Sequence, residues 1–278
     1  MASSPDEQPP PVAFEWKTAD PSIFPDGIKT SGQLDPEPHL LVPYEDFPDD
    51  ITGPTVWHAA DYADHPDRWV HRFTPDENAA LSAATDAFAA TTTPLHAMTA
   101  ALFPLPPALT TFLASVRREI LHGRGFILFR GVPVTEWGVP KTAIAYMGLG
   151  AHLGLAISQN GRGHVLGHVK DVGGDTRQLD RTRIYRTTAR QFFHTDDCDI
   201  VGLLCVARAL QGGESDIVSA HAVYNHLRAH NPDALRTLAS PTWYFDRKGE
   251  VSAGQLPYIR APIMSREPPP ATPPAGRV

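Results

Sequence analysis

The stretch RQFFHTDDCDIVGLLC, residues 190–205, places a histidine and an aspartate one residue apart, at His194 and Asp196. An aromatic run precedes the pair and an apolar run follows it, so we expect one strand to end at His194 and another to follow. In a strand, residues i and i+2 point to the same face, which would let both side chains meet one metal ion. A polar turn between two strands explains the same residues equally well.

The tripeptide HPD at residues 65–67 has the same spacing and provides an internal comparison. With 13 histidines in the chain, about one H-x-D sequence is expected by chance. The central proline and the proline-broken sequence around it favour a surface loop. We therefore predict no function for His65 and Asp67.

The composition narrows the class of protein. Of the 278 residues, 42% are hydrophobic and 20% are charged, as in an ordinary globular enzyme, and the net charge of -7 argues against nucleic-acid binding. The two cysteines exclude a disulfide framework and a cysteine-based zinc finger. We find no membrane-spanning run and no secretory signal at the start, so we expect a soluble cytoplasmic protein without a membrane partner.

The 28 prolines gather towards the two ends of the chain and suggest its organisation. We expect a disordered start over residues 1–12 and an ordered, proline-rich arm rich in aromatic residues over 13–73. A single domain is expected over 74–266, followed by a low-complexity tail over 267–278.

Helix signals are clearest in the first half of this domain. Thr74 is a predicted N-cap with Pro75 in the first turn, and a second helix is predicted to end at Gly123. Further helices are expected over residues 141–154 and 220–240, the last interrupted at Pro232.

Strand signals dominate the second half. Short β-rich runs between residues 164 and 220 follow an isolated apolar run at 126–129, and residues 241–250 resume the pattern. Helices followed by a mostly β half predict an α+β fold with antiparallel pairing.

Three sequence blocks in fixed order carry a resemblance to a known family. They are GRGFILFRGVPV from residue 123, YMGLGAHLGLAISQNGRG from residue 146, and the long block RTTARQFFHTDDCDIVGLLCVARALQGGESDIVSAHAVYNHLRAHNPDAL from residue 186. Together they resemble the TauD/TfdA-like Fe(II)- and 2-oxoglutarate-dependent dioxygenases, most closely a fungal-type branch, over about residues 49–262.

The resemblance implies a double-stranded β-helix, or jelly-roll, core with flanking helices. It implies that His194 and Asp196 bind Fe(II) and that Ser215, where the family usually has threonine, contacts the cosubstrate 2-oxoglutarate. Asn160 matches a pocket position. The implied reaction uses O2 to hydroxylate a small organic substrate, a carboxylate or sulfonate, and releases succinate and CO2.

The chain departs from the family pattern after this block. The family carries a second histidine ligand and a 2-oxoglutarate-binding arginine far beyond H-x-D, whereas 82 residues follow Asp196 and the histidines among them lie in a predicted helix. His226 and His230 stand at i and i+4, a spacing that can bind a metal, but a solvated surface helix is the simpler interpretation. We therefore expect late strands to be missing through C-terminal truncation. The alternative is a catalytically inactive remnant that acts as a binding or regulatory protein.

Overall fold

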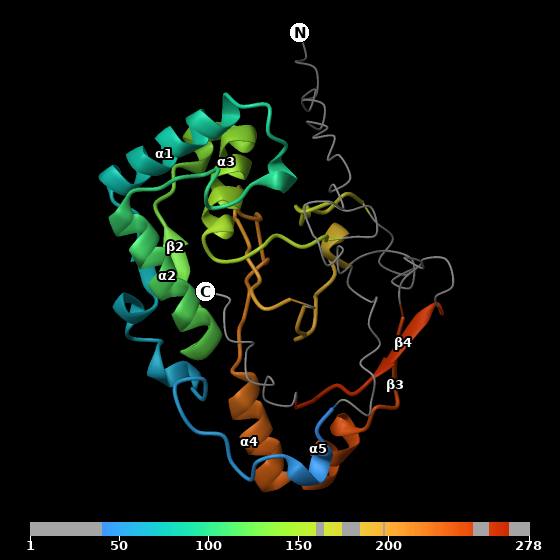
Figure 1. The fold of residues 1–278 in the computed structure, drawn as a ribbon. Coiled ribbons are helices and arrows are strands. Elements are labelled where there is room, and N and C mark those ends of the chain that lie inside the picture. Colours follow the sequence, from blue (N-terminus) through green and yellow to red (C-terminus); the bar gives the residue numbers. More distant parts are fainter. Residues whose placement is uncertain (1–40, 160–163, 174–183, 197, 247–255, 267–278) are drawn as a thin grey trace, which may run out of the picture.

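The computed structural model describes five stretches of the chain: residues 41–159, 164–173, 184–196, 198–246 and 256–266. Figure 1 shows the helices of residues 75–151 gathered on one side, the helices of residues 220–239 below them, and the strands Trp243–Asp246 and Tyr258–Ala261 on the opposite side. The predicted start and tail, residues 13–40 of the arm, and Asn160 lie outside the described residues.

The first group contains α1 (Pro75–Ala89), α2 (Pro107–His122) and α3 (Val134–Ala151). The start of α1 is confirmed as predicted. The Thr74 hydroxyl accepts the Glu77 N–H at 3.2 Å, and the Glu77 carboxylate accepts the Thr74 N–H at 2.8 Å. This capping box satisfies two backbone N–H groups at the helix start. Gly123 caps the C-terminus of α2, also as predicted.

These helices enclose the main hydrophobic core. Leu81 of α1, Leu113 of α2 and Phe103 between them are all fully buried. Gly148 of α3 faces Phe103 so closely that a Cβ there would lie 2.4 Å from the ring. The glycine therefore sets the distance at which α3 packs on this core.

Helix α3 begins earlier than the sequence predicted and contains a kink. Gly138 has φ of 70°, in the left-handed region that glycine tolerates, and Pro140 follows it. A kink at these residues therefore separates the first turn, which begins at Val134, from the regular helix that the sequence predicted from residue 141 onward.

Two short strands border this core: β1 (Val70–Arg72) and β2 (Leu128–Arg130). They pair in parallel, with Val70 opposite Leu128, so the expectation of purely antiparallel pairing is wrong here. Helices α1 and α2 lie between the two strands in the sequence, and such a crossover returns the chain in the same direction. The apolar run at residues 126–129 does contribute to a strand, displaced by one or two residues.

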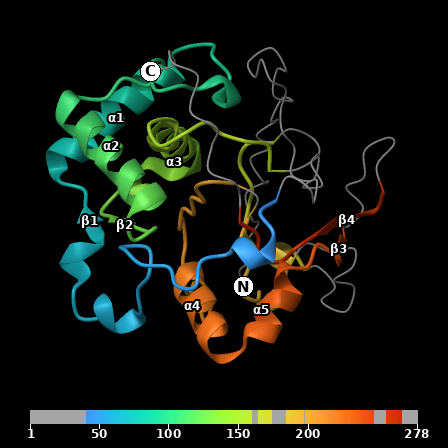
Figure 2. The same cartoon turned by 60° about the horizontal axis from the view of Figure 1, so that its bottom comes forward.

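The second group contains α4 (Ala220–His230) and α5 (Pro232–Ala239). The predicted break at Pro232 is confirmed, because Asn231 ends α4 and its side chain accepts the Ala234 N–H at 3.1 Å to cap α5. Strands β3 (Trp243–Asp246) and β4 (Tyr258–Ala261) follow as an antiparallel pair. Figure 2 shows this hairpin beside α5.

An N-terminal strap, residues 42–57, packs along α4. Phe47 and Tyr224 are buried together, and the Tyr224 hydroxyl donates to the carbonyl of Pro48. Arg228 pairs with Asp49 at 2.6 Å, and the Ile51 N–H donates to Asn225 at 2.9 Å. Polar and apolar contacts therefore both hold the strap to the helix.

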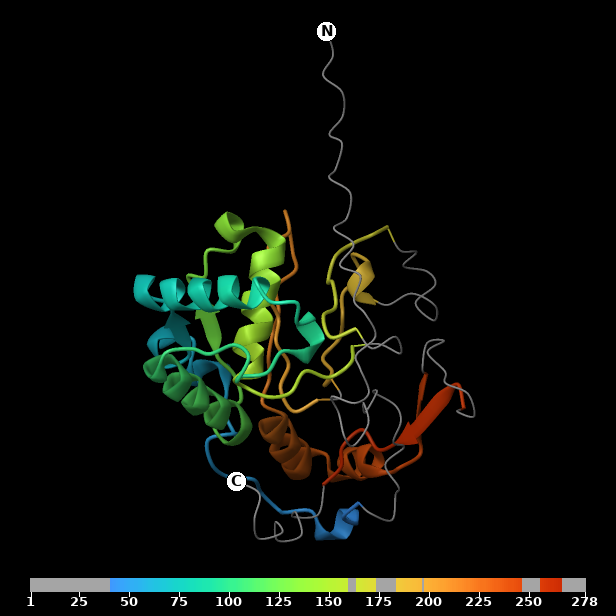
Figure 3. The same cartoon turned by 45° about the horizontal axis from the view of Figure 1, so that its top comes forward.

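The β-rich runs expected between residues 164 and 220 form no strands among the described residues. Figure 3 shows this part of the chain, in yellow and orange, between α3 and the β3–β4 pair, as coil apart from a short 3-10 helix at Ile184–Arg186. Two of these runs do meet: the Lys170 N–H donates to the Tyr185 carbonyl and the Val172 N–H to the Arg186 carbonyl, both at 3.1 Å. These two hydrogen bonds do not extend into the regular ladder that a strand needs. The fold is mixed helix and strand, with two separate two-stranded sheets and no closed barrel within the described ranges.

None of the helices in the described part of the chain is both long enough and apolar enough to cross a membrane.

Candidate functional site

His194 and Asp196 lie close together in the coil between residues 187 and 196. The His194 Nε2 and the Asp196 Oδ1 are 3.7 Å apart, too far for a good hydrogen bond but near enough to bind one ion. Their side chains are 47% and 56% exposed. The pair is therefore accessible from solvent, although its backbone is not the strand that the sequence predicted.

The orientation of the His194 ring is set by its own neighbours. Its Nδ1 lies 2.7 Å from the carbonyl oxygen of Phe192, and because a carbonyl only accepts, Nδ1 carries the proton. In the neutral ring Nε2 then holds the lone pair, and it accepts from the Gln191 side-chain amide at 3.1 Å. The nitrogen that faces Asp196 is thus the one able to bind a metal.

A third ligand does not join this pair among the described residues, where no group of three His, Cys, Asp or Glu side chains gathers. His221 lies 2.7 Å through its Nδ1 from the Thr55 hydroxyl. His226 and His230 face one another on α4. The structure therefore supplies two metal donors at this position, a carboxylate and an imidazole.

Ser215 is exposed in the coil that precedes α4. Gly212 and Gly213 have φ of 74° and 81°, so the paired glycines make a left-handed bend that other residues resist. Within the described residues no hydrogen bond joins Ser215 to His194 or Asp196. The role predicted for Ser215 stays a prediction, and Asn160 lies outside the described residues.

The apolar run after Asp196 is anchored on α3 at one point. A Cβ on Gly202 would lie 2.6 Å from the hydroxyl oxygen of Tyr146. Burial raises the pKa of the Tyr146 hydroxyl, which stays neutral at physiological pH. This close approach fixes where the chain leaves the His194–Asp196 pair and runs along α3.

His65 and Asp67 have a different setting. Both are exposed: His65 directly precedes a short 3-10 helix, Pro66–Arg68, in the proline-rich region, and Asp67 lies within it. The predicted surface location of the HPD sequence is confirmed.

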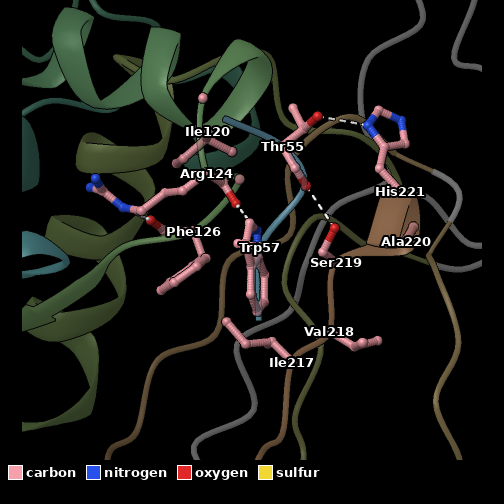
Figure 4. Close-up of a pocket in the computed structure, with 12 residues that line it drawn as sticks. Thr55, Trp57, Ile120, Arg124, Phe126, Ile217, Val218, Ser219, Ala220 and His221 are labelled. Atoms are coloured by element: carbon pink, nitrogen blue, oxygen red, sulfur yellow. Dashed lines mark hydrogen bonds between the residues drawn. The ribbon is translucent and has the colours of Figure 1, made fainter. Parts of the chain in front are cut away.

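A cavity of about 300 Å³ lies elsewhere, between the strap, the end of α2 and the start of α4 (Figure 4). The Trp57 indole N–H donates to the carbonyl of Arg124 at 2.8 Å, and the Ser219 hydroxyl donates to the carbonyl of Thr55 at 2.6 Å. Its polar groups are thus largely occupied by contacts within the protein, and apolar side chains such as Phe126 complete the wall. The sequence did not predict this cavity. The one sequence feature that pointed to it was the density of aromatic residues in the arm, which includes Trp57.

Comparison with known proteins adds evidence on the family. The family described as taurine catabolism dioxygenase TauD, TfdA matches residues 91–277. FR-33289 synthase from Streptomyces rubellomurinus is 32% identical over 152 residues, which cover 55% of this chain and 44% of that protein. The taurine hydroxylase-like protein SAT17 from Stachybotrys chartarum is 29% identical over 146 residues, covering 50% and 38% respectively. The matched part thus spans less than half the length of either relative.

Proposed function

The chain belongs to the TauD/TfdA dioxygenase family, and from this premise we propose that it is a non-haem Fe(II)- and 2-oxoglutarate-dependent dioxygenase. The observation that carries the proposal is the His194–Asp196 pair, which lies inside the matched region and brings an imidazole nitrogen within 3.7 Å of a carboxylate oxygen.

The donor set fits the implied metal in type. Non-haem Fe(II) oxygenases use two histidines and one carboxylate and leave the other coordination positions open. His194 offers an unprotonated Nε2 and Asp196 a carboxylate that offsets part of the positive charge, so two of the three donors are present. Bound with 2-oxoglutarate and O2, Fe(II) would supply the oxidising power to hydroxylate an unactivated C–H bond, with release of succinate and CO2.

The neighbouring residues have supporting roles in this proposal. The Phe192 carbonyl holds the Nδ1 proton and so directs Nε2 toward Asp196. Gln191 occupies Nε2 without the ion and would have to release it when the ion binds. We assign Ser215 and Asn160 to 2-oxoglutarate through the family resemblance, with the serine hydroxyl as a hydrogen-bond donor to a carboxylate.

The proposal extends to the fold and the substrate. Membership of the family supports a jelly-roll core, to which the proposed domain over residues 74–266 would contribute. The two relatives carry different names, a synthase and a taurine hydroxylase-like protein, so we propose only a small organic substrate bearing a carboxylate or a sulfonate.

An anaerobic titration tests this function. Fe(II) and 2-oxoglutarate are added to the purified chain, and the weak visible absorption of the iron–2-oxoglutarate chelate is followed. We expect this absorption in the wild type and its loss in His194→Ala, whereas His65→Ala, which removes an exposed histidine of the same H-x-D spacing, retains it.

Equal loss in both variants would overturn the assignment of the pair. Absence of the absorption in folded wild-type protein would overturn the enzymatic proposal and leave the alternative, a non-catalytic binding or regulatory protein.

A further inference from the structure

Helix α4 carries two histidines one turn apart on the same face. The ring centroids of His226 and His230 are 4.7 Å apart, and the ring planes are inclined by 48°. Side chains at i and i+4 are neighbours on a helix surface, so this spacing presents two imidazoles to one point in solvent.

Both rings are available to a ligand. Each residue is exposed, and within the described residues the only side-chain interaction of either ring is its contact with the other. His221, at the start of the same helix, differs because its Nδ1 is engaged by the Thr55 hydroxyl. No described side chain therefore competes for the nitrogens of His226 and His230.

The position also suits a positive charge. His230 is the last residue of α4, where the final backbone carbonyls carry partial negative charge. The nearby cation, Arg228, is already paired with Asp49 at 2.6 Å. Neutral imidazole is a good ligand for the late first-row metals, with the highest affinity for Cu(II).

We propose that His226 and His230 form a surface chelate for a late first-row divalent metal ion, separate from the His194–Asp196 pair. Two protein ligands leave the remaining coordination positions to water, so the ion is exchangeable. The chelate spans the last turn of α4, directly before the break at Asn231 and Pro232. Bound metal would therefore hold that turn in its helical conformation and raise the stability of the folded chain.

Copper binding to the full chain tests the proposal. CuCl2 is titrated into the wild type, His226→Gln, His230→Gln and the double variant, and the dissociation constant is measured by calorimetry. Electron paramagnetic resonance reports how many nitrogens bind the ion. We expect a two-nitrogen signal in the wild type, and each single variant should weaken binding by at least about tenfold.

Two control variants separate this site from the proposed iron site. His65→Gln removes an isolated exposed histidine, and His194→Ala combined with Asp196→Ala removes the other candidate donors. Neither should change the two-nitrogen signal. Copper affinity that is unchanged by His226→Gln and His230→Gln would overturn the proposal, as would a two-nitrogen signal that disappears in the His194–Asp196 variant alone.

The thermal midpoint gives a second readout. We expect CuCl2 to raise it in the wild type and to leave it unchanged in the double variant, and circular dichroism without metal verifies that both proteins fold alike. An equal rise in both proteins would contradict binding at α4.

Discussion

The helices between residues 75 and 151 and the coil between residues 190 and 218 are similarly apolar in sequence but differ in burial. Leu81 and Leu113 in the helical region are fully buried, whereas Phe192 and Leu203 in the coil are 78% and 72% exposed. A helix satisfies its backbone hydrogen bonds within one segment, but a strand depends on a second segment. Apolar residues are therefore buried only where the chain also supplies a surface for them to pack on.

The largest expected effect comes from removing a buried leucine. Leu113→Ala leaves a cavity among α1, α2 and α3 and should lower the free energy of unfolding by about 3 kcal/mol. Leu203→Ala, the same change at an exposed site, should alter it by less than about 0.5 kcal/mol.

Urea denaturation followed by circular dichroism measures both variants. Comparable losses of stability in the two would mean that the coil is packed in solution, and the contrast between the regions would not hold.

Two glycines of α3 test how tightly the helical region is packed. Gly148→Ala places a methyl group 2.4 Å from Phe103 and should destabilise the protein by about 2 kcal/mol. Gly150→Ala, two residues along, meets no atom within 4 Å and should stabilise the helix by up to about 1 kcal/mol.

We expect Gly148→Ala to lower the thermal midpoint and Gly150→Ala to raise it. A stabilising Gly148→Ala would show that α3 can move away from Phe103 at little cost.

The helices were predictable because their signals are local. Thr74, Pro75 and Gly123 mark helix ends through their own backbone preferences, and Pro232 marks a break in the same way. The runs between residues 164 and 220 have strand composition, but strand formation depends on segments distant in the sequence, which composition does not identify. The parallel β1–β2 pair was missed for the same reason.

The candidate site was predictable only in part. The i, i+2 spacing of His194 and Asp196 agrees with their nearness, but the strand expected to present them is absent and their metal-binding role stays a prediction. The cavity beside Trp57 was not predictable. It is lined by the strap and by residues near 124 and 219, and no short sequence pattern shows that segments so far apart in the chain lie close together.

A smaller loss of stability is expected from a substitution at the start of α1. Thr74→Ala removes the hydroxyl that accepts the Glu77 N–H and should cost about 1 kcal/mol of stability. Thr74→Ser, which keeps the hydroxyl, should restore most of it. Thermal unfolding of both variants measures the difference, and equal midpoints would show that the cap contributes nothing.

The smallest expected effect is on the pH dependence of the stability of the folded protein. Burial alone would raise the pKa of Glu77, but hydrogen bonds from Thr74 and the nearby His71 outweigh it, and the pKa lies below the model-compound value of 4.5. A carboxyl whose pKa is lowered by folding stabilises the protein above its unfolded pKa, and this contribution is lost as the pH falls through the folded pKa.

Glu77→Gln should therefore reduce the loss of stability between pH 6 and pH 3 by a few tenths of a kcal/mol, since the group is partly exposed. Thermal midpoints across this range provide the measurement. A steeper pH dependence in Glu77→Gln than in the wild type would contradict the direction of the shift.

The strap on α4 has a consequence for the order of folding. The Tyr224 hydroxyl and its acceptor at Pro48 are 176 residues apart, and Arg266 reaches Asp46 across 220 residues. Closing a loop of this length costs roughly 2–3 kcal/mol more entropy than closing one of ten residues. The α1–α3 core, whose contacts are closer in sequence, should therefore assemble first, and docking of the strap on α4 should be a late, slow kinetic phase.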